Sequence, residues 1–479
     1  MTTLDQGCAQ QRSGQKSGIF DRFLSLTRTA EKRNERVIPE DVPLHLDVPA
    51  LPGFRQEAAT AELEEPGHRP LSMSAMAAPI KPISLRRDSI YAAFNTAMPV
   101  TDRHGLAGRN SELEKLVEAI VVQRKHAVIF GTRGSGKTSL ARVFGDLADE
   151  AGCIALYASA NGEADFDSLF RPFLTELPMS SSGQERVRKM MGEPLDVSRL
   201  SALLVEEVRE RSILIIDEYD RVQSETAKQE VATLLKLLTD IHSPVQVVLV
   251  GIAGDIDGLI AAHPSLRRHL APQRVAPIPK PELERLLLAC ANNGRLSIDD
   301  DALDVLAGAA MGSPYHARLF GMSAALVTEA GGRDRMVLSD IEQGLVSALE
   351  DWEEMSGQTH ALFRRILWEA GSVPGNGRRM IALAAVAASQ MSAISYERLV
   401  KLGHEVLGGG SINEGQARDA MARLQPALVP TPNGELWMFE DTLAPQFLLL
   451  MAKQPVQSAP PVQTPAEEMR ALLKGVDGL

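Results

Sequence analysis

Cysteine is scarce in this chain of 479 residues, which contains only Cys8, Cys153 and Cys290. The number of cysteines is small and odd, and the three lie far apart in the sequence. Both facts argue against a disulfide framework and against a zinc site. We therefore expect a reducing, cytoplasmic setting. Aromatic residues are also few, at 4% of the chain, so the core must be built mainly from Leu, Val, Ala and Ile.

Long apolar runs are lacking too, and none approaches the roughly 20 residues that a membrane span requires. The N-terminus has no hydrophobic stretch typical of a signal peptide, because Asp5 and Asp21 interrupt it. Positive charge is not in excess either, since the formal net charge is −12. We expect no membrane contact, and any contact with nucleic acid has to come from a local basic patch.

The N-terminal region, residues 1–100, carries recurrent prolines and little hydrophobic periodicity, which predicts a largely disordered segment. One stretch differs: Ile19, Phe23 and Leu26 share one face of a candidate short helix near residues 19–30. Two interpretations stay open. The stretch is either a peptide that docks on a partner or on this chain, or a transient helix in a tail.

Further along, short apolar runs alternate with helical patterns over residues 101–278. This alternation predicts an α/β core with a mostly parallel sheet covered on both faces. Helical patterns alone predict a helical bundle over residues 279–350. Helices followed by a hairpin with an Asn-Gly turn, over residues 351–453, are the order of a winged helix-turn-helix. A Pro/Gln-rich tail, residues 454–479, ends the sequence.

The most specific motif has the spacing of a phosphate-binding loop, and its residues are Gly131, Thr132, Arg133, Gly134, Ser135, Gly136, Lys137 and Thr138. An apolar strand-like run precedes it, and a helical pattern beginning at Ser139 follows. The glycines let backbone N–H groups turn toward a phosphate, and the helix N-terminus adds partial positive charge. We expect Lys137 to reach the β- and γ-phosphates of a nucleotide, Thr138 to ligate Mg²⁺, and Ser139 to complete the site. A glycine turn that carries Lys-Thr by chance is the alternative, which these flanks disfavour.

An acidic pair supplies the chemistry that a phosphate-binding loop lacks. Asp217 and Glu218 directly follow the apolar run 213–216. Asp217 is the candidate to hold Mg²⁺, and Glu218 is the candidate to polarise the attacking water. A strand that ends in solvated acids is a common alternative, but the neighbouring phosphate loop favours the catalytic interpretation.

In this order, the phosphate loop, acidic pair, helical lid and winged helix resemble AAA+ and STAND ATPases, above all the origin-recognition (initiator)-like clade. The segment 108–113 resembles the G-R-x-x-E-L box of such modules, 217–221 resembles their D-E-x-D-R form, and 312–315 resembles the start of a lid helix. The resemblance implies a three-layer P-loop NTPase core of the ASCE/AAA+ type with a helical lid. It also implies ATP and Mg²⁺ as cofactors and an ATPase activity.

The family pattern implies further site residues. Pro314, which opens the lid helix, and Arg318, one turn later, are candidates for nucleotide contact. Arg267 and Arg268 stand where the family carries an arginine finger that acts on a neighbouring subunit, and a basic surface turn is the alternative. At sensor 1 the sequence departs from the family, since Asp255 is the nearest polar residue. Weak sensors favour slow hydrolysis.

The partner stays open between two hypotheses. The first is an ATP-driven switch whose lid and winged helix control assembly on DNA or on a protein, with Gln416, Arg418 and Arg423 on the recognition helix. The second is a nucleotide-dependent regulatory or scaffold subunit with slow or no turnover, which acts only through protein contacts or self-assembly. The hairpin 427–439 carries no Lys or Arg, whereas a DNA-reading wing is usually more basic.

Overall fold

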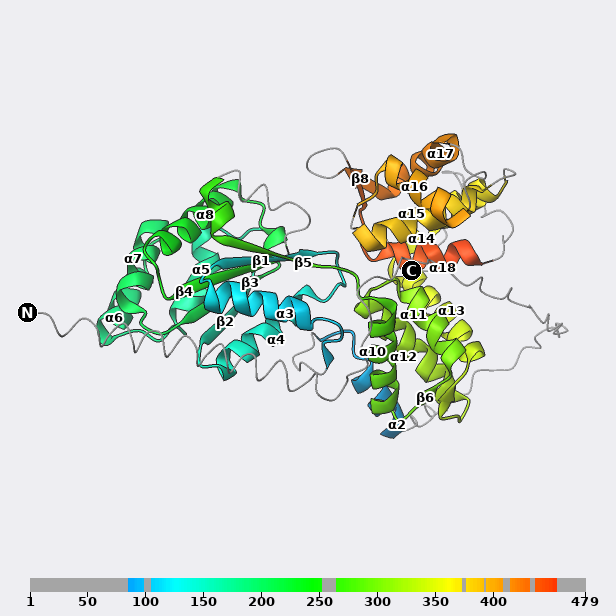
Figure 1. The fold of residues 1–479 in the computed structure, drawn as a ribbon, viewed down its shortest axis with the longest axis horizontal. Coiled ribbons are helices and arrows are strands. Elements are labelled where there is room, and N and C mark those ends of the chain that lie inside the picture. The colour runs from blue at the N-terminus through cyan, green and yellow to red at the C-terminus, as the bar shows by residue number, and fades with distance from the viewer. Residues whose placement is uncertain are drawn as a thin grey trace, which may run out of the picture.

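The computed structural model describes residues 85–98, 105–251, 264–372, 376–391, 393–407, 414–430 and 436–454. The predictions for the helix near residues 19–30, for Asp255 and for residues 455–479 fall outside these ranges. Figure 1 shows two bodies side by side, which we call the sheet body and the helical body. Within the described residues, no helix has the length and apolar content to cross a membrane.

The sheet body is built on five strands that are all parallel to their neighbours, in the order β2-β3-β4-β1-β5. The strands are β1 (His126–Gly131), β2 (Ile154–Ser159), β3 (Ser212–Asp217), β4 (Val245–Val250) and β5 (Leu270–Val275). This order places β4 between the strand that leads into the phosphate loop and the strand that ends in the acidic pair. The predicted P-loop α/β core is confirmed.

Helices cover both faces of the sheet, because alternate residues of each buried strand point to opposite sides. Ile213 and Ile215 pack in one cluster with the helices of the first face, while Leu214 and Ile216 pack in another with the helices of the second. The first face holds α3 (Asn110–Val117), which continues as a π-helix (Glu118–Val122), and α4 (Lys137–Glu150). The second holds α5 (Phe166–Leu174), α7 (Val197–Glu207) and α8 (Glu225–Asp240). The result is a three-layer arrangement (Figure 1).

The last strand lies earlier in the chain than its sequence suggested. A short strand is expected near residues 274–277, but β5 spans Leu270–Val275 and contains Pro272. Proline lacks a backbone N–H and is confined to strand edges, and β5 is the edge of this sheet. Because proline usually interrupts a strand, the sequence predicts a start for this strand that is too late.

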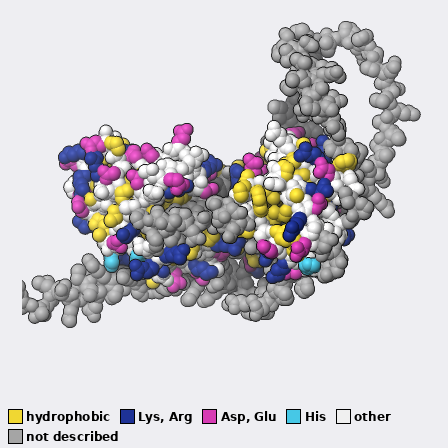
Figure 2. Space-filling model, turned by 90° about the horizontal axis from the view of Figure 1, so that it is seen from above, with side chains coloured by type: hydrophobic (Ala, Val, Ile, Leu, Met, Phe, Trp, Pro, Cys, Tyr) yellow, Lys and Arg dark blue, Asp and Glu magenta, His cyan; other side chains and the backbone are white. Residues whose placement is uncertain are grey.

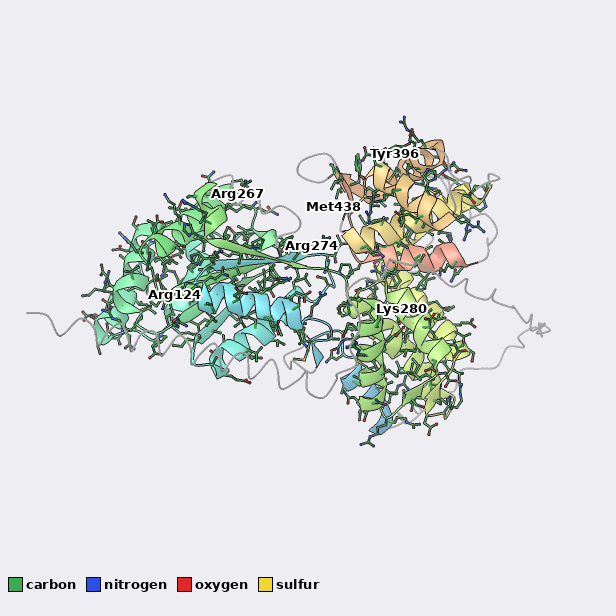
Figure 3. All side chains as sticks on the ribbon, viewed as in Figure 1. Arg124, Arg267, Arg274, Lys280, Tyr396 and Met438 are labelled. Atoms are coloured by element: carbon green, nitrogen blue, oxygen red, sulfur yellow. The ribbon has the colours of Figure 1, made fainter. Side chains whose placement is uncertain are left out.

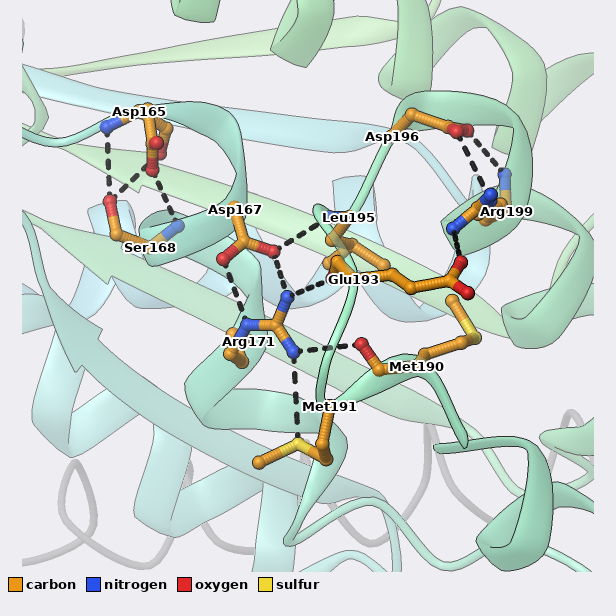
Figure 4. A network of polar contacts seen from close by, with 10 residues as sticks. All are labelled: Asp165, Asp167, Ser168, Arg171, Met190, Met191, Glu193, Leu195, Asp196 and Arg199. Carbon is orange, nitrogen blue, oxygen red and sulfur yellow. Dashed lines mark hydrogen bonds and ion pairs between the residues drawn. The ribbon is translucent and has the colours of Figure 1, made fainter. Parts of the chain in front are cut away.

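A further helix forms where the sequence suggested a polar surface excursion. Helix α6 (Ser181–Met190) begins after Ser180, whose hydroxyl accepts a hydrogen bond from Gly183 N at 3.1 Å. The turn that follows is held by Arg171 of α5, which donates to the carbonyls of Met190 at 3.2 Å and Glu193 at 2.8 Å (Figure 4). The Ser180 cap is a local contact, but the contacts of Arg171 span 19 and 22 positions of sequence, so the local polar composition gave no sign of them.

The helical body begins with a lid of four helices. They are α10 (Lys280–Asn293), α11 (Asp300–Ala310), α12 (Pro314–Ala330) and α13 (Leu338–Met355), joined by the two-residue strands β6 (Ser297–Ile298) and β7 (Arg335–Met336). The C-terminal unit follows on it with α14 (Gly357–Ser372), α15 (Gly377–Met391), α16 (Tyr396–Leu407), α17 (Glu414–Leu424), β8 (Leu428–Pro430), β9 (Trp437–Phe439) and α18 (Ala444–Lys453). These elements come in the order expected for a winged helix, and that assignment itself stays a prediction.

Lid and C-terminal unit share one continuous cluster of buried side chains. The rings of Trp352 on α13 and Phe447 on α18 are stacked with centroids 4.6 Å apart. Phe447 also meets Phe320 of α12 edge-on at 5.8 Å. A shared core of this kind favours movement of the two parts as one piece.

One segment of the region predicted to be disordered belongs to this helical body. Helix α2 (Leu85–Ala93) packs on α10 and α12, with Ile90 and Phe94 fully buried in the shared cluster. The boundary at residue 101 is therefore wrong for residues 85–98. Ile90 in the helix and Phe94 directly after it are buried. Their partners lie about 200 residues away, so the sequence pattern alone was too weak to reveal the segment.

Candidate nucleotide-binding site

The predicted phosphate loop joins β1 to α4 in the left-handed turns that its glycines permit. Gly134 and Gly136 have φ angles of +75° and +91°, which side chains with a Cβ rarely adopt. At Gly131 a Cβ would lie 2.5 Å from the carbonyl oxygen of Val275 on β5. The loop therefore presents the N-terminus of the 14-residue helix α4, with its unpaired N–H groups, to the cavity.

Lys137 lies within this loop. Its ammonium group donates to the carbonyl oxygens of Gly131 at 3.1 Å and Thr132 at 3.0 Å. Burial lowers the pKa of Lys137, and the carboxylates of Asp220 and Asp217 oppose that shift. The cation is thus held beside the loop and close to the acidic cluster, as a group that neutralises phosphate oxygens has to be.

Asp217 ends β3 and is only 5% exposed. One of its carboxylate oxygens accepts a hydrogen bond from the backbone N–H of Glu218 at 2.8 Å, and the other accepts one from the hydroxyl of Tyr157. Glu218 is held in the left-handed region at φ 55°. Its carboxylate accepts from Ser159 at 3.4 Å and pairs with Arg221 at 3.2 Å.

The remaining acid of this turn reaches the end of β4. A Cβ on Gly251 would lie 2.1 Å from an oxygen of Asp220, so the glycine leaves room for that carboxylate. Burial raises the pKa of Asp220, and the nearby Lys137 opposes the shift. The sequence shows no polar residue at the expected sensor 1 position, and here Asp220 brings one to the same strand end.

Arg109 is a supporting residue of the site that was not among the predicted site residues. It is 2% exposed and pairs with Glu112 at 2.8 Å. Its guanidinium donates to the carbonyls of Ser135 at 3.0 Å and Ala276 at 2.6 Å. Arg109 therefore ties the phosphate loop to the chain that leaves β5. Its position in the G-R-x-x-E-L box was the available signal.

A cavity of about 730 Å³ lies where the two bodies meet, within the size range of small-ligand sites. Every residue predicted for the loop lines it: Gly131, Thr132, Arg133, Gly134, Ser135, Gly136, Lys137, Thr138 and Ser139. Asp217 and Glu218 line it as well. Its charged lining is dominated by cations, with Arg109, Arg133, Lys137, Arg142, Arg221 and Arg318 against Asp217, Glu218 and Asp220. Such an excess suits a polyanionic ligand.

The helical body supplies the opposite wall of the cavity. Pro314 and Arg318 of the lid line it, and Arg318 donates to the carbonyl of Gly105 at 3.1 Å. Their contact with a nucleotide stays a prediction. Residues 95–98 beyond α2 and Met438 of the C-terminal unit also line the cavity. Met438 lies on the side of that unit that faces the sheet body (Figure 3). Neither contribution was predicted, because both depend on packing between distant segments.

Arg267 and Arg268 do not reach this cavity. They end a short 3-10 helix, Pro264–Arg268, that packs against α8, and both side chains are exposed. Figure 3 shows Arg267 near α8, at the edge of the sheet body away from the lid. This location leaves the role of an arginine finger for a neighbouring subunit as a prediction.

The donor set fits Mg²⁺. Asp217 offers carboxylate oxygens and Thr138 a hydroxyl oxygen on the wall of one cavity, and Mg²⁺ prefers one or two such ligands plus phosphate oxygens and water. Asp217 and Thr138 would hold the ion, which would neutralise negative charge on the phosphates of a bound nucleotide.

Comparison with known proteins agrees with this geometry. A family model described as AAA domain matches residues 121–260. ORC1-type DNA replication protein 2 of Thermoplasma acidophilum is 30% identical over 129 residues, which are 27% of this chain and 31% of that protein. The chain thus matches about a third of this relative's length.

Similar solved structures include the RuvB Holliday junction branch migration motor of Thermotoga maritima, at 16% identity and a TM-score of 0.37 over 72% of this chain and 96% of that chain. The ORC1 protein of Aeropyrum pernix in complex with DNA gives 17% identity and a TM-score of 0.37 over 72% and 92%. These overlaps are loose, so the assignment rests on the domain match, the Orc1-type relative and the strand order. Residues 121–260 therefore form an AAA domain with a P-loop core, and the chain is similar over 129 residues to an Orc1-type protein.

Proposed function

We propose that this protein is an ATP-driven molecular switch. ATP binds with Mg²⁺ between the sheet body and the helical body, is hydrolysed slowly, and sets the position of one body relative to the other. The main observation behind this proposal is that one residue of the phosphate loop, Gly134, lies against both parts of the helical body. A Cβ there would lie 3.1 Å from Leu443 of the C-terminal unit and 3.3 Å from the Ser313 hydroxyl of the lid.

A chain of hydrogen bonds links these three points. The hydroxyl of Ser313 lies 3.3 Å from the carbonyl oxygen of Gly134 and 2.9 Å from Nδ1 of His316. Nε2 of His316 lies 3.1 Å from the carbonyl oxygen of Leu443. That carbonyl only accepts, so Nε2 carries the proton, and burial keeps the ring neutral by lowering the pKa of His316 to about 3. Nδ1 is then an acceptor.

With the His316 proton on Nε2, two acceptors compete for the single hydroxyl proton of Ser313. These acceptors are Nδ1 of His316 and the carbonyl oxygen of Gly134. The ring nitrogen is nearer in this structure. A shift of the Gly134 peptide when phosphate binds changes the balance between them. This competition supports transmission of the loop's state to the lid and the C-terminal unit.

For hydrolysis, the chain's own residues have separate tasks. Lys137 and the N–H groups at the start of α4 stabilise charge on the phosphate oxygens. Glu218 orients a water molecule and accepts its proton as the water oxygen attacks the γ-phosphorus atom, while the bond from that atom to the bridging oxygen breaks and ADP leaves. Because the carboxylate of Glu218 is engaged by Ser159 and Arg221, activation of water competes with these contacts. This competition supports slow turnover.

Two variants test the proposal. Lys137→Ala is expected to abolish binding of a fluorescent ATP analogue, because it removes the cation beside the phosphate loop. Glu218→Gln is expected to keep that binding while phosphate release falls at least about a hundredfold, the usual contribution of a general base. Turnover of the Glu218→Gln protein at the parent rate would contradict the assignment.

The assembly that the switch controls forms on a protein or on DNA, and one observation favours protein contact alone. On α17, Arg423 donates to Asp419 at 2.8 Å and pairs with Glu369 at 3.4 Å. Arg418 lies over the ring of Tyr396 at 5.1 Å and pairs with Glu414. The two arginines proposed for DNA are thus engaged within the chain, and Figure 2 shows basic and acidic side chains interspersed on the face that it draws.

A salt titration separates the two partners. Contact through DNA phosphates predicts an affinity that falls steeply as salt rises, whereas no binding at low salt would leave the protein-only alternative. Light scattering with and without an ATP analogue then tests for self-assembly in the same samples.

A further inference from the structure

Tyr157 has no assigned task, yet its hydroxyl meets the proposed metal ligand. It lies on β2, where its partner in the register with β3 is Ile215. Asp217 follows two positions later on the same strand and therefore faces the same side of the sheet, toward α4. The Tyr157 hydroxyl donates to one carboxylate oxygen of Asp217, and both residues line the cavity.

The ring of Tyr157 is itself held in place. Arg142 of α4 places the carbon of its guanidinium 4.3 Å from the ring centre. Arg142 lies one helical turn after Thr138 and shares its face of the helix. The helix that carries one proposed metal ligand therefore also clamps the side chain that holds the other.

Both oxygens of Asp217 receive a donor, and the two donors come from different sources. The backbone N–H of Glu218 is fixed by the chain itself, whereas the Tyr157 hydroxyl reaches across from the next strand. Two donors on two oxygens fix the plane of a carboxylate. Each oxygen has two lone pairs, so a donor on an oxygen does not exclude a metal ion.

We propose that Tyr157 is a positioning residue that orients Asp217 for Mg²⁺, with Arg142 holding its ring. The inference rests on the proposed nucleotide site. Groups that hydrogen-bond to metal ligands typically change metal affinity by about 10- to 100-fold when removed. In this proposal the hydroxyl of Tyr157 acts through Asp217, to which it donates.

Tyr157→Phe removes one oxygen atom and keeps the ring under Arg142. The test measures binding of a fluorescent ATP analogue, first in EDTA and then as Mg²⁺ is added. We expect unchanged affinity in EDTA and a Mg²⁺ midpoint raised about tenfold. Mn²⁺ in place of Mg²⁺ gives a second readout, because its electron paramagnetic resonance spectrum reports bound ion without turnover. Tyr91→Phe, on α2 and outside the cavity, is the matched control.

A double-mutant cycle decides whether Tyr157 acts through Asp217. In an Asp217→Asn background, Tyr157→Phe is expected to cause no further change in the Mg²⁺ midpoint. An unchanged midpoint in the single variant, a lowered one, or an equal shift in both backgrounds would each overturn the inference. If the parent protein binds no nucleotide, the proposed function is refuted as well. If the parent binds nucleotide and Tyr157→Phe leaves the Mg²⁺ midpoint unchanged, only the role of Tyr157 is refuted.

Discussion

Helix α2 docks on the lid largely through one side chain that follows the helix, Phe94. Phe94 is 1% exposed, and it packs against a backbone position without a side chain: a Cβ on Gly321 of α12 would lie 2.5 Å from its ring. Ile90 is the other fully buried residue of this segment. Arg86 adds a hydrogen bond to the carbonyl of Arg333 at 3.0 Å.

Phe94→Ala is therefore expected to detach the segment. Full burial of an apolar side chain contributes about 1.5–3 kcal/mol, so Ile90 and Phe94 together supply about 3–6 kcal/mol before the cost of ordering the chain. Replacing a buried Phe by Ala removes about 3–5 kcal/mol, which is most of that gain. Residues 95–98 then leave the cavity wall, and we expect ATP affinity to fall about tenfold, or about 1.4 kcal/mol.

Hydrogen exchange over residues 85–98 and titration with a fluorescent ATP analogue measure the two consequences. Tyr91→Ala is the matched control, because Tyr91 lies on the same helix but is 42% exposed, and it should change neither. Unchanged exchange in the Phe94→Ala protein would refute the docking energy. Fast exchange with unchanged ATP affinity would refute the role of residues 95–98 in the site.

Three further predictions concern the switch, the pH response and assembly. His316→Phe keeps an aromatic ring but loses the hydrogen bond to the carbonyl oxygen of Leu443. Proteolysis of the C-terminal unit should therefore become faster, while nucleotide affinity in EDTA stays the same. A protease pattern equal to that of the parent protein would refute the link between His316 and the C-terminal unit. Burial lowers the pKa of His316 to about 3 and that of His126 to about 4, from 6.5. The folded state therefore binds fewer protons, and its stability is complete above pH 6.5 and falls as pH drops below that value. At pH 5 the loss is about 2 kcal/mol for each ring, measurable as a lower urea midpoint than at pH 8, and equal midpoints would contradict it. Finally, Arg267→Ala with Arg268→Ala should lower the ATPase rate without changing ATP affinity if subunits assemble, and light scattering shows whether they do.

Local patterns were enough to predict which polar residues lie at the strand ends beside the cavity. The phosphate loop and the pair Asp217 and Glu218 each combine an apolar run with a polar motif in adjacent positions, so neighbouring residues carry the whole signal. Parallel strands then bring both motifs to one edge of the sheet. Pro314 and Arg318 were instead implied by the resemblance to the AAA+ family, and both line the same cavity.

The residues that support this site could not be predicted from local sequence patterns. Tyr157 and Arg109 meet their partners across 60 and 26 positions of sequence. Tyr157 stands in no local pattern that distinguishes it from a core tyrosine, and the G-R-x-x-E-L box that contains Arg109 does not show which groups its side chain meets. Helix α2 lacks a strong apolar face of its own and is recognisable only once α10 and α12 are in place. Tertiary packing, not propensity, decides these positions.

The link between the two bodies limits how the switch can move. Strand β5 ends at Val275 and α10 begins at Lys280, so four residues join the sheet body to the lid. At one end the carbonyl of Ala276 accepts from Arg109 at 2.6 Å, and at the other the N–H of Ile278 donates to the carbonyl of Gly312 at 2.8 Å. Only Pro277, with its fixed φ, separates these anchors. In the proposed switch, the two bodies therefore pivot near the phosphate loop without separating there. The contacts of Gly134 with the helical body would then set its position.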